Sequence, residues 1–242
     1  MPVKKGDFIK LNYTGTVDGS IFDTTYEDVA KEAGIHNPSA LYGPVTINVG
    51  CHHVILGLDE EIEGKEIGQE GELDVPPDKA FGDHDPEKVK DFQKNSFKEK
   101  PKKGMQIKVP DKGEGTVADI IGNRVLIDFN HPYAGKTLHY TYNIEEEVTG
   151  VEDQVQGLIK LYAGREMDIS FEDGIVTFML PAGINYDRRW VMWRSRVVHE
   201  SLEQIPQIEE IVFKEVFKRP DKVDEPTDEP ADEPVDEPAD EE

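Results

Sequence analysis

Apolar and polar residues alternate on both sides of an Asp-Gly dipeptide near the start of the chain. In DFIKLNYTGTVDGSIFDTT, Leu11 and Tyr13 precede the dipeptide and Phe22 follows it. A period of two places alternate side chains on opposite faces of a strand, and Asp-Gly suits the tight turn of a hairpin. This stretch therefore predicts a β-hairpin with one buried face, and it confines the N-terminal part of the chain to a fold built on antiparallel strands.

Three later segments, VTINVG, GELDVPP and LHYTYNI, alternate in the same way and predict further strands. By contrast, LDEEIEG places Leu58 and Ile62 four residues apart among acidic residues and ends at Gly64. This is the pattern of one short amphipathic helix. The sequence thus favours an α+β fold, in which a curved antiparallel sheet formed by residues 1–83 and 129–150 wraps around a short helix.

Two further units are expected outside this domain. Residues 84–128 contain the short alternating runs GMQIKV, GTVADII and RVLIDF between glycine-rich turns, which predict a small inserted β domain. After residue 150, helical spacing in VEDQVQGLIKLYAG is followed by two strand-like runs, a helix over 188–204 and a final strand. The order α-β-β-α-β predicts a compact α+β module at 151–219.

The last part of the chain repeats a DEPx unit. Residues 220–242 hold twelve acidic residues and one lysine, in a chain whose net charge is −24. Each proline removes a backbone donor and like charges repel, so neither a helix nor a packed core can form. We expect an extended, disordered tail that serves solubility and spacing, or one that binds a specific basic partner. The acidic charge argues against nucleic acid as a partner.

The cysteine count and the distribution of apolar residues indicate in which cellular compartment the protein is expected. The single cysteine cannot form an intrachain disulfide, which is typical of a reducing environment. The opening MPVKKGDFIKLNYTG has no apolar leader core, and no run of eighteen apolar residues occurs. We therefore expect a cytoplasmic protein with no membrane partner.

Cys51, His52 and His53 are the one local candidate for a metal site. Adjacent residues on an extended chain point in alternating directions, so three in a row seldom converge on one ion. We expect a solvated turn there, with no metal and no other cofactor. Spacing alone does not bring other histidines to them: His84, His131 and His139. A nucleophile elbow, a phosphate loop and the HExxH pattern are also absent from the sequence.

Three motifs carry a resemblance to a known family: LNYTGTVDGSIFDTT, VILGLDEEIEGKEIGQEGELDVPPDKAFG and NHPYAGKTLHYTY. Together they resemble the FKBP-type peptidyl-prolyl cis-trans isomerases. The layout is similar to the SlyD-like class, whose flap carries an inserted chaperone domain, and to its long archaeal members, which add a C-terminal domain. The resemblance is strong to about residue 150, and beyond that it is by position. It implies an enzyme that accelerates rotation of Xaa-Pro bonds in unfolded or partly folded proteins.

The resemblance also implies an isomerase pocket formed by Tyr13, Phe22, Asp23, Val54, Ile55, Leu58, Phe81 and Tyr140. Val45 and Tyr133 are expected at its rim. Leu58 stands where human-type members have a tryptophan floor, Phe81 stands where they have a tyrosine, and Tyr140 replaces a phenylalanine. The smaller floor implies weak binding of macrolide inhibitors rather than a loss of catalysis.

Five apolar residues of the insert are candidates for a client-binding surface: Phe92, Phe97, Met105, Ile107 and Val109. A domain of about 45 residues buries little apolar surface, so these side chains either complete its core or stay exposed for binding. Three functions remain open: an isomerase with a chaperone insert, a peptide-binding chaperone with little isomerase turnover, and an acidic-tail chaperone for basic proteins. The expected partners are unfolded or proline-containing polypeptides, with a homodimer through the C-terminal domain as a further expectation.

Overall fold

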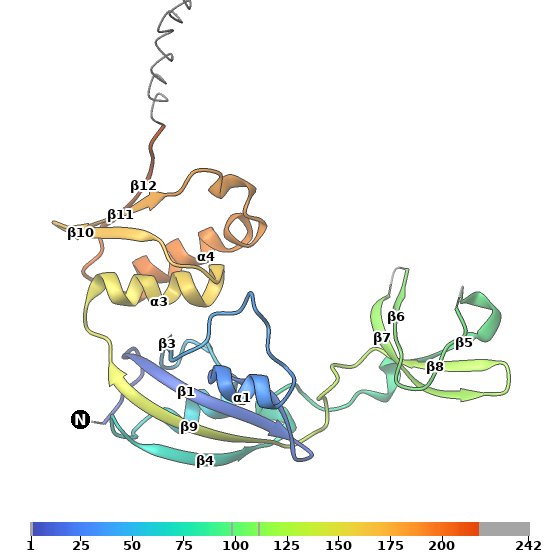
Figure 1. Ribbon diagram of the computed structural model, residues 1–242. Helices are drawn as coiled ribbons and strands as arrows, with labels where there is room; N and C mark the ends of the chain where they lie inside the picture. Colours follow the sequence, from blue (N-terminus) through green and yellow to red (C-terminus); the bar gives the residue numbers. More distant parts are fainter. Residues whose placement is uncertain (1, 98, 111, 218–242) are drawn as a thin grey trace, which may run out of the picture.

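The computed structural model describes residues 2–97, 99–110 and 112–217, which form three β-sheets with helices packed on two of them (Figure 1). The acidic repeat at 220–242, for which the sequence predicts a disordered tail, lies outside the described residues.

The first sheet has five strands: β1 (Phe8–Val17), β2 (Ser20–Thr24), β3 (Val45–Asn48), β4 (Glu70–Val75) and β9 (Leu138–Glu147). Their order is β2-β1-β9-β4, β3 also pairs with β1, and every pair is antiparallel. The predicted hairpin is confirmed: Asp18 and Gly19 both have positive φ angles, 51° and 77°, as the tight turn between right-twisted strands requires.

Helix α2 (Leu56–Ile62) packs against this sheet. Leu58 and Ile62 are fully buried, and they share one hydrophobic core with Leu138 and Ile144 from the inner face of β9. The prediction of an α+β fold with a curved antiparallel sheet around this helix is confirmed.

A second helix in this domain was not predicted. Helix α1 (Glu27–Glu32) buries only Ala30, so its six residues carry no apolar period from which a helix could be inferred. A short 3-10 turn, η1 (Pro77–Lys79), leads the chain out of β4 toward the insert.

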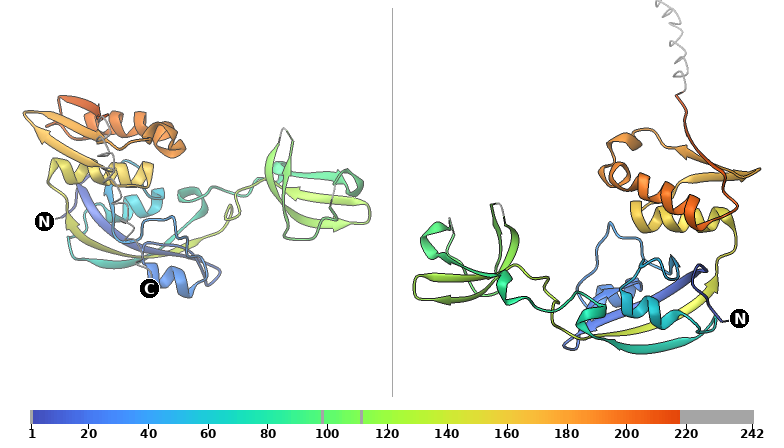
Figure 2. Two further views of the ribbon diagram at one scale, coloured as in Figure 1. Left: turned by 45° about the horizontal axis from the view of Figure 1, so that its top comes forward. Right: turned by 180° about the vertical axis from the view of Figure 1, so that it is seen from behind.

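The inserted domain is an antiparallel sheet of β5 (Val89–Gln93), β6 (Gln106–Val109), β7 (Gly113–Ile121) and β8 (Arg124–Asp128), in the order β5-β8-β7-β6. The 3-10 turns η2 (Pro86–Lys88) and η3 (Lys94–Ser96) flank β5. The sequence predicts β6, β7 and β8 but not β5, because VKDFQ contains only two apolar residues. Figures 1 and 2 show this domain standing apart from the rest, joined to it by two chain segments.

The C-terminal unit contains α3 (Val151–Ala163), β10 (Asp168–Glu172), β11 (Ile175–Leu180), η4 (Ile184–Tyr186), α4 (Arg188–Gln204) and β12 (Glu210–Glu215). Strands β10 and β11 form an antiparallel hairpin, and β12 runs parallel to β11. The predicted α-β-β-α-β order and the predicted helix over 188–204 are confirmed. Within the described part of the chain, no helix is both long enough and apolar enough to cross a membrane.

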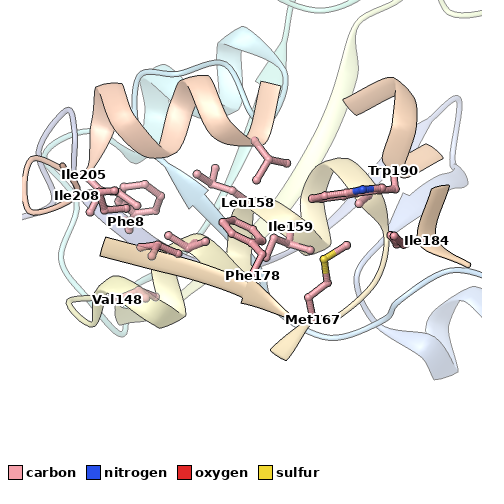
Figure 3. Packing of buried hydrophobic residues seen from close by; sticks show 14 residues of the cluster. Phe8, Val148, Leu158, Ile159, Met167, Phe178, Ile184, Trp190, Ile205 and Ile208 are labelled. Atoms are coloured by element: carbon pink, nitrogen blue, oxygen red, sulfur yellow. The ribbon is translucent and has the colours of Figure 1, made fainter. Parts of the chain in front are cut away.

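Helices α3 and α4 bury their apolar sides with this third sheet around Phe178 and Trp190, whose ring centroids are 6.3 Å apart (Figure 3). Phe8, from the start of β1, joins the same cluster. The C-terminal unit therefore shares hydrophobic core with the first sheet.

The two units also approach closely where α3 packs on β3. A Cβ atom built on Gly157 of α3 would lie 2.4 Å from the Cβ of Thr46 on β3, well inside the contact distance of two carbon atoms. Only glycine allows the helix to approach the strand this closely.

Gly157→Ala should destabilise the protein, although alanine ordinarily favours a helix over glycine by about 1 kcal/mol. The added methyl group overlaps Thr46, so helix or strand must move, and we expect a net loss of about 1–3 kcal/mol. Thermal unfolding measures the change, with Lys160→Ala on the exposed side of α3 as the matched control. A Gly157→Ala variant as stable as this control would show that α3 does not pack tightly on β3.

Candidate functional site

A cavity of about 300 Å³, here called the pocket, is lined by Tyr13, Phe22, Asp23, His53, Val54, Ile55, Leu58, Phe81 and Tyr140. These residues come from β1, β2, the loop and helix at α2, the segment after η1, and β9. Eight of them are the residues that the family resemblance implies for the isomerase site. His53 is the ninth, and sequence reasoning missed it.

Close packing of backbone and rings shapes the base of the pocket. Gly15 on β1 is the register partner of Tyr140 on β9. A Cβ atom at Gly15 would lie 2.9 Å from the rings of both Phe22 and Tyr140. The absence of a side chain at Gly15 therefore lets both rings lie directly on the strand.

The pocket walls are aromatic rings that contact each other edge to face. The ring of Phe22 meets Tyr140 at 5.9 Å between centroids and Phe81 at 6.3 Å, both close to perpendicular. Tyr13 lies tilted against Tyr140, also at 5.9 Å. These arrangements are the favourable ones for aromatic pairs, so the rings hold each other in place. The result is a preformed cavity with largely aromatic walls.

The two residues expected at the rim have different surroundings. Tyr133 packs on Phe22 with ring centroids 4.7 Å apart and on Phe81 at 5.7 Å, so it extends the aromatic wall. Val45 lies on β3, partly buried against the hydrophobic core, and is not among the residues that line the pocket. His131, which sequence reasoning did not assign to the site, stacks on Phe81 at 4.0 Å.

Asp23 places a carboxylate at the mouth of the pocket, where the residue remains exposed overall. The Tyr13 hydroxyl donates to Asp23 Oδ2 at 3.2 Å. Partial desolvation raises the pKa of Asp23, and hydrogen bonds from Tyr13 and from the Thr24 N–H partly offset this rise. Burial raises the pKa of Tyr13, and the charge of Asp23 raises it further. Burial likewise raises the pKa of Tyr140, so both hydroxyls keep their protons and remain donors.

The loop before α2 supplies Val54 and Ile55 to the pocket. Buried Asp59 of α2 accepts the N–H of Gly50 at 2.9 Å and the N–H of His52 at 3.0 Å, one on each carboxylate oxygen. Gly50 and His52 both have positive φ angles, 85° and 57°. The loop is thus a tight turn that hydrogen bonds to Asp59 fix against the start of α2. The N–H of Ile55 lies at the start of α2, where backbone donors have no partner within the helix.

The prediction of a solvated turn at Cys51, His52 and His53 is wrong for the third residue. The His52 side chain is 66% exposed, whereas the His53 side chain is 1% exposed. His53 Nε2 lies 3.0 Å from Glu200 Oε2 in the C-terminal unit, and Cys51 Sγ donates to Asn48 Oδ1 at 3.0 Å. Local sequence held no signal of this burial, because the partner of His53 is 147 residues away.

The remaining histidines do not gather at one point. His84 pairs with Asp128 and His139 with Asp74, while His131 stacks on Phe81. In the described part of the chain, no group of three or more His, Cys, Asp or Glu side chains is placed to hold a metal ion.

A second cavity, of about 520 Å³, lies in the inserted domain and is here called the insert groove. Its lining includes the five residues predicted for client binding: Phe92, Phe97, Met105, Ile107 and Val109. All five are half-buried and pack against the small core of Val117, Val125 and Ile127. The same side chains therefore complete the core of the domain and form an apolar surface.

Three family models match successive parts of the chain. The model described as FKBP-type peptidyl-prolyl cis-trans isomerase matches residues 1–109. The model described as FKBP26, IF domain, matches residues 88–133, and the one described as FKBP26_C-terminal matches residues 151–218.

Individual relatives carry corresponding names. The chain is 36% identical over 150 residues to a short-type peptidyl-prolyl cis-trans isomerase of Methanocaldococcus jannaschii. The matched region covers 60% of this chain and 93% of the relative. It is 29% identical over 109 residues to the FKBP-type 16 kDa peptidyl-prolyl cis-trans isomerase of Escherichia coli, covering 43% of this chain and 73% of the relative. Identity to SlyD of Haemophilus influenzae is 28% over 151 residues, with 60% and 72% covered. The chain therefore belongs to the FKBP-type peptidyl-prolyl cis-trans isomerases, in the SlyD-like class with a domain inserted in the flap.

Proposed function

We propose that this isomerase acts on Xaa-Pro bonds of unfolded or partly folded polypeptides, and that its inserted domain holds these clients as a chaperone. The observation that carries the proposal is a pair of separate apolar cavities: the pocket of about 300 Å³ and the insert groove of about 520 Å³. They lie in two domains joined by two chain segments (Figure 2). A client chain can occupy both at once.

The reaction requires a suitable environment rather than a nucleophile. Amide resonance gives the Xaa-Pro bond a rotational barrier of about 18–20 kcal/mol, and rotation breaks no σ bond. The twisted bond loses the charge separation that water stabilises in the planar amide, so a water-poor apolar site favours the twisted state. Lowering the barrier by about 4–7 kcal/mol accelerates rotation about 10³–10⁵-fold.

Several groups of the pocket have distinct roles in this mechanism. Phe22, Leu58 and Phe81 surround the proline ring with apolar surface. The N–H of Ile55 donates to a carbonyl of the substrate and holds one side of the rotating bond. Asp23 orients the Tyr13 hydroxyl and adds a fixed charge beside the bond that twists.

The insert groove supplies the binding that a proline pocket lacks. A pocket that contacts one residue buries little area, so a client chain dissociates from it quickly. Phe92, Phe97 and Met105 present apolar surface to another part of the same chain. Because the two sites are linked, a chain held in the groove keeps its prolines at a raised local concentration around the pocket.

Tyr13→Ala and Asp23→Ala should each slow isomerisation of a short Xaa-Pro peptide several-fold, on the order of 1 kcal/mol in barrier height. The first variant removes part of the aromatic wall, and the second releases the Tyr13 hydroxyl. A tetrapeptide isomerisation assay measures both, and circular dichroism checks the fold. Tyr186→Ala, at a tyrosine 93% exposed in the C-terminal unit, is the matched control. Unchanged rates in both pocket variants would place the catalytic site elsewhere.

Deleting residues 84–128 should spare activity on a tetrapeptide, because none of the pocket residues is removed. The same deletion should sharply reduce activity on a protein whose refolding is limited by proline isomerisation, and abolish suppression of aggregation. Both follow from loss of the insert groove. If instead the two activities fell equally, the insert would be a structural part of the pocket rim and the two-site proposal would fail.

Charged substitutions in the insert groove should impair client binding and leave isomerisation of short peptides intact. Met105→Lys and Val109→Lys each put a charged side chain in its lining, so suppression of aggregation should fall several-fold while tetrapeptide activity is retained. Ile121→Lys is the matched control, because Ile121 is 62% exposed at the end of β7 and does not line the groove. An equal loss in the control would mean that added charge, not occupation of the groove, is responsible.

A further inference from the structure

One buried side chain ties the pocket loop to the C-terminal unit. His53 Nδ1 accepts the backbone N–H of Asn48 at 3.0 Å, and His53 Nε2 lies 3.0 Å from Glu200 Oε2 on α4. The exposed fractions of the two side chains are only 1% for His53 and 4% for Glu200. Since Nδ1 is an acceptor, the ring proton is on Nε2, and His53 donates to Glu200.

Glu200 is itself held firmly within the C-terminal unit. Its Oε1 accepts from the Tyr162 hydroxyl at 2.8 Å and pairs with Arg196 one turn earlier on α4 at 2.5 Å. Burial alone would raise the pKa of Glu200, but hydrogen bonds from His53 and Tyr162 and the charge of Arg196 bring it below its ordinary value. The ring of Tyr162 also stands edge-on to His53, with centroids 5.9 Å apart. Glu200 is therefore an ionised carboxylate at a well-defined position.

His53 belongs to the loop that forms one side of the pocket. The residue lines the cavity itself, and Val54 and Ile55 follow it directly. Asp59 of α2 holds the first half of this loop through the N–H groups of Gly50 and His52. Glu200 holds the second half from a different unit, at the residue that precedes the pocket backbone.

We propose that Glu200 is a positioning residue for isomerisation: through His53, the C-terminal unit sets the place of Val54 and of the Ile55 N–H in the pocket. This inference rests on the pocket assignment proposed above. Without Glu200, the buried Nε2–H of His53 has lost its acceptor, and the loop must move to recover one. A donor displaced by about 1 Å from the rotating bond loses much of its effect.

If Glu200 only stabilised the C-terminal unit, its loss would lower the melting temperature without changing the pocket. Asp187 provides the matched control for such an effect. Asp187 caps α4 by accepting the N–H of Trp190 at 3.0 Å, and it pairs with Arg165 at 2.7 Å. Neither contact involves His53. Asp187→Ala should therefore lower the melting temperature through the C-terminal unit and leave the pocket loop in place.

The test measures kcat and KM for a tetrapeptide, the melting temperature, and the Ile55 amide signal by NMR, on full-length variants. Glu200→Ala should lower kcat about five- to tenfold with little change in KM, because Phe22 and Phe81, which pack on the proline ring, lie outside the displaced loop. It should also shift the Ile55 signal. Glu200→Gln, which keeps an oxygen acceptor for His53, should recover most of the rate. Asp187→Ala should change neither kcat nor the Ile55 signal.

A double-mutant cycle shows whether the two residues act as one unit. His53→Asn keeps an acceptor for Asn48 but cannot reach Glu200, so its loss in kcat should match that of Glu200→Ala, and the double variant should lose no more. A kcat within twofold of wild type in Glu200→Ala, additive losses, or an equal loss in Asp187→Ala would overturn the proposal. Tyr13→Ala, run in parallel, distinguishes this failure from failure of the pocket assignment itself.

Discussion

The pairing of β9 with β1 on one side and β4 on the other is the constraint on which the rest of the structure depends. The register places Val75, at the end of β4, opposite Leu138, at the start of β9. Strands β4 and β9 are still paired at this point. The chain can therefore leave the sheet after β4, form a separate domain and return at β9 without disturbing the hydrophobic core of the first domain. Phe81 lies on the outgoing segment and Tyr133 on the returning one, so the path of the insertion also forms one wall of the pocket.

Hydrogen bonds between the two segments define where the insert begins. The N–H of Gly135 donates to the carbonyl of Gly82 at 2.8 Å, and Asn130 Nδ2 donates to the carbonyl of Asp85 at 2.8 Å. These bonds hold the segments together next to the pocket, while the sheet of the insert forms no strand pairs with the first sheet in the described residues. In the proposed mechanism the client chain itself spans the distance, so the pocket and the insert groove need not touch.

The sequence predicts this fold best where one face of an element is buried. Burial alternates most clearly in β9, whose inward side chains share a core with α2, and the Asp-Gly turn sets the hairpin partner of β1. The burial pattern is weak in α1, where only Ala30 is buried, and in β5, which exposes Lys90 and Asp91. The pocket residues could be predicted because they lie in motifs that resemble those of the isomerase family. The link from His53 to Glu200 could not be predicted, since it depends on how two units pack, and the residues next to His53 do not indicate whether its side chain is buried.

The proposed chemistry of the pocket depends on the proline ring rather than on a reactive group of the substrate. Rotation moves no proton, and the raised pKa values of Tyr13 and Tyr140 keep their hydroxyls as neutral donors. In the proposed mechanism, aromatic walls contact the proline ring, which all Xaa-Pro substrates share. The proposed preference for unfolded chains would then arise in the insert groove, where the flexible side chain of Met105 can adapt to many apolar partners. A folded protein buries the apolar residues that such a groove binds, so the two sites together would select clients by their state of folding rather than by their sequence.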